Sequence, residues 1–299
     1  MKDIAHLETD KLIEHIEKEL NHAYSECFKT LKKKLKDIYL KLDMSLSEEE
    51  RAKLLNQSKR IQKLINSMAI EIQSVNKNAV EMVRENTYTC YAINYDYSTF
   101  ILEHSSGFDT GYNVFNRGAV KKLLKGEELP FTLIAYDELT DKYRIVRELT
   151  RQLTQSIILG ESITKMAKRI QDVTNKNYKS SVTIARTEMT RVQNAGRLDS
   201  FKRGEALGLK LKKKWISTID SRTRDSHAKL MNETVDLDKP FSNGLMHPGG
   251  VGKASEVINC RCTHIVEFEG FKRSEAELKL DETLKKMSYE QWRDLHDRG

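Results

Sequence analysis

The feature that most constrains this chain of 299 residues is a stripe of apolar side chains near its start. Its members recur at steps of three and four residues: Ile16, Leu20, Ala23, Cys27, Leu31, Leu35, Ile38 and Leu42. This spacing puts them on one helix face and predicts one helix over residues 8–42. A second stripe runs from Leu54 to Val75, behind Ser47 and Glu50, whose spacing is typical of an N-terminal capping box. The two helices are expected to form an antiparallel hairpin.

The middle of the chain is less clearly patterned. Residues 88–100 fit a helix by the spacing of their tyrosines, although their aromatic and β-branched content also suits a strand. Glycines gather over residues 105–140, where we expect a loop-rich hinge between two halves. Further helices are expected at 141–160, from Glu161 onward and at 180–207, the last of them ended by Gly208.

The character of the sequence changes after Gly208. Residues 215–219 and 257–268 are predicted strands, residues 227–230 a short helix and residues 274–296 a helical tail. The fold class is therefore α+β: a mainly helical chain with a long N-terminal hairpin and further helices, followed by a small β-sheet module and a C-terminal helix. The expected parts are residues 1–105, 106–140, 141–270 and 271–299.

Composition excludes several classes of protein. Only three prolines and 14 glycines are present, so the chain is not collagen-like or Pro-rich, and long helices are favoured. No stretch approaches the roughly 18 uncharged apolar residues of a membrane span, and the start lacks the apolar region of a secretion signal. Because two of the four cysteines lie far apart in helical segments, we expect a reducing compartment rather than a disulfide scaffold.

Positive charge is concentrated in residues 144–225, which hold 19 lysines and arginines against 8 acidic residues, whereas the whole chain has a net charge of +7. Such a stripe attracts a polyanion through phosphate contacts and counterion release, without reading base sequence. The predicted DNA contacts are Lys202, Arg203, Lys210, Lys212, Lys213 and Lys214. The alternative is a solubilising surface. Few aromatic residues interrupt the stripe, so stacking on single strands is poorly supported.

Four side chains of the nitrogen and sulfur type that zinc accepts occur late in the chain: His227, His247, Cys260 and Cys262. They suggest a structural zinc as a possible cofactor. The spacing argues against it, because residues two apart in a strand lie about 7 Å apart. Both thiols reach one ion only if the strand bends or ends there. The alternative is that the cysteines pack in the core strand while His227 bonds a backbone carbonyl.

Catalytic motifs are sparse. The sequence has no Walker loop, no H-E-x-x-H, no G-x-S-x-G and no dinucleotide fingerprint. Asp220, Asp225 and His227 could hold a metal and activate water on a phosphodiester, and Arg224 is near them in sequence. In the same turn, Asp220 or Ser221 is placed to cap the short helix. A nuclease or nucleotide-transfer enzyme centred on this turn is therefore an alternative.

The order of several short motifs resembles the phage Mu F-like head morphogenesis family, the minor head proteins of tailed phages and prophages. The motifs are Ala185-Arg-Thr-Glu188, Asn194, Trp215, Asp220-x-Arg222-x-Arg224-x-x-His227, Pro248 and Asn259-Cys-Arg261-Cys262. The resemblance covers roughly residues 141–268. The family usually has a glycine shortly after the histidine, where this chain has Asn232. Asparagine is the residue that best tolerates the left-handed conformation, so the turn can be kept.

The resemblance implies a virion component without an established catalytic activity. It implies binding to the portal protein inside the phage head, a role in head assembly and contact with packaged DNA. Other head proteins are expected partners, and the host cytoplasm is the expected location during assembly. A scaffold that binds only protein is a further alternative. In each case we expect Trp215 to anchor the small sheet, with the motif residues around it serving architecture.

Overall fold

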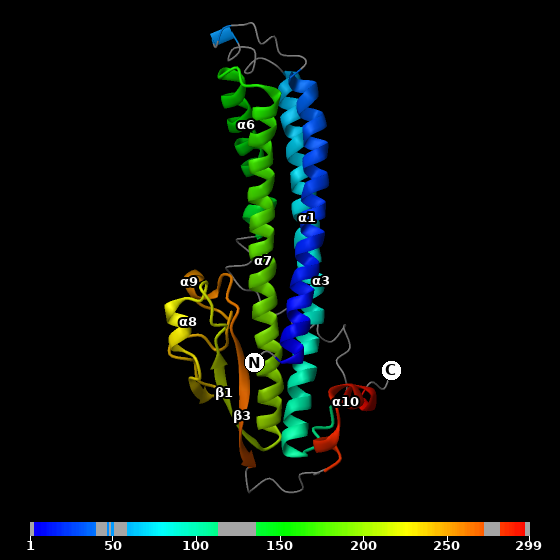
Figure 1. Ribbon diagram of the computed structural model, residues 1–299, viewed down its shortest axis with the longest axis vertical. Coiled ribbons are helices and arrows are strands. Elements are labelled where there is room, and N and C mark those ends of the chain that lie inside the picture. The colour runs from blue at the N-terminus through cyan, green and yellow to red at the C-terminus, as the bar shows by residue number, and fades with distance from the viewer. Residues whose placement is uncertain are drawn as a thin grey trace. The chain divides into compact units, whose positions relative to one another are not determined.

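The computed structural model describes residues 3–39, 47, 49–50, 59–112, 136–271 and 282–296. This part of the chain is mainly helical and contains a three-stranded antiparallel sheet and a C-terminal helix, which confirms the predicted fold class (Figure 1). None of its helices is long and apolar enough to cross a membrane. The predicted hinge falls largely on residues 113–135, which lie outside the described residues.

Long helices dominate the chain. They are α1 (Ile4–Tyr39), α3 (Lys59–Ser106), α6 (Lys142–Ile158) and α7 (Ile163–Ala206). The aromatic segment at 88–100 is helical and forms part of α3. The two helices expected after Gly160 are one helix, α7, because residues 170–180 contain no glycine or proline that would interrupt it.

Two of the predicted helix boundaries have the expected contacts. The backbone N–H of Ser47 donates to Glu50 Oε2 at 2.9 Å, and the Glu50 N–H approaches Ser47 Oγ at 3.4 Å, which is the capping-box geometry. Gly208 has a φ of 103° directly after α7, a conformation that ends a helix and that glycine adopts without strain.

The later elements are shorter. They are β1 (Leu209–Ile216), α8 (Asp225–Lys229), β2 (Thr234–Asp236), α9 (Ala254–Val257), β3 (Thr263–Phe271), a 3₁₀ turn (Leu284–Lys286) and α10 (Tyr289–His296). The predicted strand at 215–219 was placed too late, because the lysines of β1 obscure an alternation of buried and exposed positions that begins at Leu209. The predicted strand at 257–268 begins only at Thr263, because α9 ends at Val257 and the positive φ of Asn259 turns the chain before the strand.

The sheet has the order β2-β1-β3, so β1 is its central strand. Lys214 pairs with Thr234 on one side, and Trp215 pairs with His264 on the other. The register with β3 shifts between Lys210 and Leu211. This arrangement puts the side chains of β1 on two faces, one of them buried.

The chain divides into two compact units, each assembled from separate segments. The helical unit comprises His15–Val83 and Pro130–Ile184, and its core is built from apolar residues of α1, α3, α6 and α7, including Leu31, Ile65 and Leu149. The sheet unit comprises Met1–Glu14, Arg84–Leu129 and Ala185–Gly299.

Two apolar clusters lie in the described part of the sheet unit. One contains Leu198 and Phe201 of α7 with Leu209 and Leu211 of β1. The other surrounds Trp215 and is described below. Its C-terminal helix α10 is fixed by Trp292, whose indole N–H donates to the buried carboxylate of Glu103 at 2.5 Å. The first part of the predicted helical tail, residues 274–281, lies outside the described residues.

Candidate functional site

A second core of the sheet unit is centred on Trp215. The indole is fully buried and packs with Leu230, Phe241, Leu245, Val257, Cys260 and Cys262. The rings of Phe241 and His227 meet it edge to face, with centroids 5.0 and 5.5 Å away. Its N–H donates to Ser217 Oγ at 3.1 Å, so the buried polar edge is satisfied. Trp215 and the two cysteines therefore lie in one apolar cluster.

The backbone of the Asn259-Cys-Arg-Cys262 motif is held by polar side chains of α7. Thr187 Oγ1 accepts from the Asn259 N–H at 3.1 Å, and Thr190 Oγ1 donates to the Cys260 carbonyl at 2.7 Å. Asn194 donates to the Cys262 carbonyl at 3.1 Å. Because these residues recur every three or four positions, they line one face of the helix. We call Thr187, Thr190, Asn194 and Arg197 the polar ladder.

The polar ladder continues to β3. Asn194 Oδ1 accepts from the Thr263 hydroxyl at 3.0 Å and from the His264 N–H at 3.2 Å. The buried guanidinium of Arg197 makes a paired contact with Asp3, with both N···O distances at 2.7 Å. Burial of Asp3 opposes ionisation, but the hydrogen bond and charge of Arg197 prevail and lower the pKa of Asp3.

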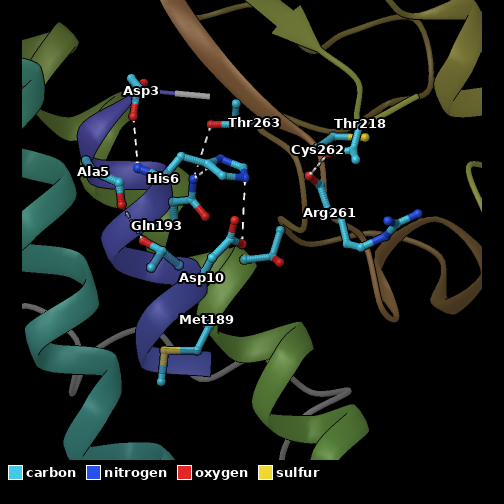
Figure 2. A network of polar contacts seen from close by, with 12 residues as sticks. Asp3, Ala5, His6, Asp10, Met189, Gln193, Thr218, Arg261, Cys262 and Thr263 are labelled. Carbon is cyan, nitrogen blue, oxygen red and sulfur yellow. Dashed lines mark hydrogen bonds and ion pairs between the residues drawn. The ribbon is translucent and has the colours of Figure 1, made fainter. Parts of the chain in front are cut away.

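The first turns of α1 also belong to this unit. Figure 2 shows His6 of α1 beside Gln193 of α7 and Thr263 of β3. Gln193 Nε2 lies 2.9 Å from His6 Nδ1 and 3.4 Å from Thr263 Oγ1. The start of the chain therefore braces the same face of α7 that holds the cysteine motif, which the sequence did not indicate.

His227 and the two cysteines converge in the interior. His227 Nδ1 lies 3.4 Å from Cys262 Sγ and 3.7 Å from Cys260 Sγ, and all three residues are buried. The other ring nitrogen, Nε2, lies 3.1 Å from a carboxylate oxygen of Glu256 on α9. The expectation that His227 bonds a backbone carbonyl is therefore not met, because its ring nitrogens face sulfur and a carboxylate. We call His227, Cys260 and Cys262 the Cys/His cluster.

The two thiols of the Cys/His cluster differ in acidity. The Cys260 thiol donates toward Cys262, and His227 adds a hydrogen bond, which together lower the pKa of Cys262 to about 4 despite burial. The same contact, with burial, raises the pKa of Cys260. The pair therefore favours one thiolate, on Cys262, and one thiol.

The cysteines lie just before β3 rather than within it. Asn259 has a φ of 53°, which turns the chain, and β3 begins at Thr263. The condition under which both sulfurs approach one point, a strand that ends at the cysteines, is therefore met. His247 does not join them: its Nδ1 lies 3.1 Å from the Pro248 carbonyl, and its ring lies 6.3 Å from that of His264. The set of four zinc ligands considered in the sequence analysis is therefore wrong in one residue, His247.

The segment after His247 approaches α7 closely. Gly249 has a φ of 72°, and a Cβ on it would lie 3.1 Å from the Thr190 methyl and 3.2 Å from the Arg191 nitrogen. Only glycine combines that conformation with that lack of volume. His247 is held nearby in its neutral form, because burial lowers its pKa to about 4.

The arginines of the motif fix the turn from outside. Arg261, between the two cysteines, makes a bidentate ion pair with Asp220 at 2.5 and 2.6 Å, which holds the pKa of Asp220 well below its usual range. Arg224 donates to the Ile258 carbonyl. The exposed side chain of Arg222 reaches Asp220 only at 3.8 Å.

Neither Asp220 nor Ser221 caps α8, because that helix begins at Asp225 with Arg224 at its N-cap position. Instead, Asp220 Oδ1 accepts from the Arg222 N–H at 2.8 Å within the preceding turn. The cap prediction was wrong because the turn is longer than the sequence suggested. Asn232 has a φ of 68°, which confirms that asparagine takes the left-handed position where the family usually has glycine.

The predicted DNA contacts divide into three kinds. Lys202, Arg203 and Lys210 are exposed. Lys212 and Lys214 form ion pairs with Glu269 and Glu267 of β3. Lys213 is buried, and its ammonium donates to the carbonyls of Leu237 at 2.9 Å and Met246 at 2.8 Å. The prediction of Lys213 as a DNA contact was wrong, because strand alternation turns every second residue of β1 inward.

Sequence reasoning missed Glu256 and the interior role of Thr187 and Thr190. Glu256 comes from a four-residue helix that the sequence analysis did not predict, so its approach to His227 had no signal. Thr187, Thr190 and Asn194 did have one, since their spacing places three polar residues on one face of a helix whose neighbouring positions are apolar.

Comparison with known proteins gives these motifs a class. Residues 147–265 match the family described as Phage Mu protein F like protein, which includes the polar ladder, the sheet core and the cysteine motif. The resemblance found in the sequence is therefore confirmed for the part of the chain that carries the motifs. This match to a phage head family points to the virion.

Two relatives match the chain over different shares of its length. The chain is 26 % identical to minor head protein GP7 of Bacillus phage SPP1 over 296 residues, which cover 95 % of this chain and 93 % of that protein. It is 35 % identical over 161 residues to NAD(+)--arginine ADP-ribosyltransferase EFV of Enterococcus faecalis, covering half of this chain but only 32 % of that protein. The chain thus spans about a third of the latter relative. No solved structure matches the chain.

Proposed function

We propose that this chain is a minor head protein of a tailed phage or prophage that associates with the portal inside the head and acts in head assembly and DNA handling. The observation that supports this most is the alignment with a phage minor head protein along nearly the whole length of both chains. A match of that extent includes both units rather than a shared motif alone. The protein would reach the virion from the host cytoplasm, where heads assemble.

DNA contact is the part of this proposal for which the surface of α7 offers support. Lys165, Lys168, Lys176 and Lys179 are exposed on the part of α7 in the helical unit, at spacings that keep them on one face of the helix. Lys168 is paired with Asp172 at 3.6 Å. Exposed ammonium groups in a row contact phosphates without reading bases.

The sheet unit adds exposed cations of its own. Lys202 near the end of α7 and Lys210 on β1 are exposed. Arg203 is exposed too, but its guanidinium donates to the Thr110 carbonyl at 3.3 Å and lies 5.6 Å from the ring centre of Tyr112. We therefore propose Lys202 and Lys210 as the leading DNA contacts of this unit.

Duplex binding at two salt concentrations tests the DNA contact. If Lys176, Lys179, Lys202 and Lys210 contact phosphates, the affinity for duplex DNA should fall about a hundredfold between 50 and 200 mM salt. It should depend little on base sequence. The variants Lys176→Glu/Lys179→Glu and Lys202→Glu/Lys210→Glu should each lower the salt dependence by about two counterions. Lys32→Glu/Lys33→Glu on α1 makes the same change of charge outside the basic stripe and is the matched control.

Two results would remove the DNA contact. One is the absence of duplex binding at both salt concentrations, and the other is an equal loss in the α1 control. Sedimentation with empty phage heads tests the association with the portal separately. Co-sedimentation that survives nuclease treatment and requires portal-containing heads supports the portal contact, whereas binding to heads that lack the portal contradicts it.

A nucleotide-transfer activity is the second candidate, and it rests on the relative named as an NAD(+)--arginine ADP-ribosyltransferase. About two thirds of that protein lies outside the match, so its activity does not follow for the shared part. Incubation of the full chain with labelled NAD⁺ and an arginine acceptor tests it. Transfer that is lost in His227→Ala would favour this candidate, and no transfer above the protein-free rate would remove it.

A further inference from the structure

The Cys/His cluster has the dimensions of a metal site. A tetrahedral zinc ion, with Zn–S of about 2.3 Å and Zn–N of about 2.0 Å, separates a nitrogen ligand from a sulfur ligand by about 3.5 Å. His227 Nδ1 lies 3.4 and 3.7 Å from the sulfurs of Cys262 and Cys260, and the three ligand atoms lie within 4.8 Å of one another. The three atoms are therefore spaced as corners of one coordination shell.

The second nitrogen of His227 fixes the direction of the first. Nε2 lies 3.1 Å from a Glu256 oxygen, so with an ion bound at Nδ1 it would carry the ring proton and donate it to the carboxylate. The lone pair of Nδ1 would then point to an ion held between the two sulfurs. A carboxylate that accepts from the distal nitrogen of a metal-binding histidine is the usual outer partner of such a ligand, because it orients the ring and raises its basicity.

Glu256 is itself held in place. Ser226 donates to its two oxygens at 3.2 and 3.3 Å, and Asn243 donates to one at 3.5 Å. Two segments besides its own helix, α8 and the one before Gly244, therefore hold the partner of His227. Packing alone would not require a charged group at this position beside the buried ring.

The surrounding chain has little regular structure of its own. Between the end of β1 at Ile216 and the start of β3 at Thr263 there are only α8, β2 and α9, which have five, three and four residues. Short irregular segments bury too little apolar surface to be stable alone, and a structural metal is a common remedy. His227 lies early in this segment and the cysteines at its end, so one ion would link both ends.

We propose that His227, Cys260 and Cys262 bind one structural zinc ion, oriented by Glu256 and with a water molecule in the fourth position. His247 is not a ligand. The two thiolates and the imidazole are soft and intermediate ligands that select zinc over magnesium or calcium. All three residues are buried, so the ion would be enclosed in the interior of the sheet unit and would serve the fold. This inference does not depend on the proposed portal or DNA contacts.

Metal content of the full chain, purified without an affinity tag and under reducing conditions, is the first test. We expect about one zinc per chain by elemental analysis. Replacement by Co²⁺ should give sulfur-to-cobalt charge-transfer absorption together with the strong visible bands of tetrahedral cobalt. These two measurements use the wild-type chain and do not depend on whether a variant folds.

Variants then assign the ligands. Cys262→Ser and His227→Asn should each lower zinc to less than about 0.1 per chain. Cys90→Ser is the matched control, because Cys90 is another fully buried thiol of the sheet unit. His247→Asn is the matched histidine control, and both controls should keep their zinc. Glu256→Ala should weaken zinc affinity by about 10–100-fold, and Glu256→Gln should recover part of it, because its amide oxygen still accepts from Nε2.

Three outcomes would overturn the proposal. Wild-type chain that holds less than about 0.1 zinc and takes up no Co²⁺ would show a thiol–imidazole core without metal. Cobalt spectra without sulfur charge transfer would place the ion elsewhere. Loss of zinc in His247→Asn, with retention in His227→Asn, would give the site to the other histidine.

Discussion

The two units of this protein bury different kinds of side chains. The helical unit has a large apolar core with residues such as Leu31, Met68 and Leu149, and the polar residues that it buries, such as Asn76 and Asn177, are neutral. The sheet unit buries the polar ladder of α7, the Cys/His cluster and the ammonium of Lys213. A hydrogen-bonded interior requires particular atoms at particular places, whereas an apolar one requires mainly volume. Most of the family motifs therefore lie in the sheet unit.

The largest expected effect is that of Trp215→Ala. Removal of a fully buried indole from the sheet core should cost about 3–5 kcal/mol in the free energy of unfolding. Hydrogen exchange followed peptide by peptide should show lost protection in β1 and β3, with α6 in the helical unit still protected. An equal loss of protection in α6 would contradict the distinction between the two units, because it would mean that they unfold as one.

The next prediction compares two substitutions that conserve volume. Asn194→Leu should cost about 3 kcal/mol, because it leaves the Cys262 carbonyl, the Thr263 hydroxyl and the His264 N–H without their partner. Leu149→Met in the helical core should cost less than about 1.5 kcal/mol. Urea denaturation measures both. Similar costs would show that the polar interior is no more demanding than the apolar one.

The third prediction concerns pH and Lys213. Burial lowers the pKa of Lys213 from 10.5 to about 8, so between these values the unfolded chain binds more protons than the folded one. The stability of the wild type should therefore rise with pH, relative to Lys213→Met, by about 2 kcal/mol between pH 8 and 10. Parallel stability curves for the two proteins would contradict this. Lys214→Met on the opposite face of β1 is the control.

Much of the fold could be predicted from the sequence because most of it is helical. The apolar stripe from Ile16 to Leu35 and the glycine at position 208 are local signals, and the helices follow from them. The units do not follow, because each is assembled from segments far apart in the chain. The start of β1 was missed because Lys210, Lys212 and Lys214 alternate with buried residues, one of which is also a lysine.

The residues of the site around Trp215 could be predicted from the sequence, but the directions of their side chains could not. Trp215, His227, Cys260 and Cys262 could be selected because such residues are uncommon and close in sequence order. That His247 faces away and Glu256 faces His227 depends on the turns between Ile216 and Thr263, where few periodic signals exist. Tertiary contacts decide the direction of such side chains, and these contacts cannot be inferred from a single sequence.

The burial of every cysteine has a consequence for the chemical durability of the protein. A phage particle leaves its host for surroundings with oxygen and no reducing enzymes, and thiols exposed there would be oxidised or cross-linked. All four sulfurs are enclosed, with Cys27 in the helical unit and Cys90, Cys260 and Cys262 in the sheet unit. Alkylating reagents should therefore reach each sulfur only when its own unit opens, so the rate of alkylation would report the opening of each unit separately.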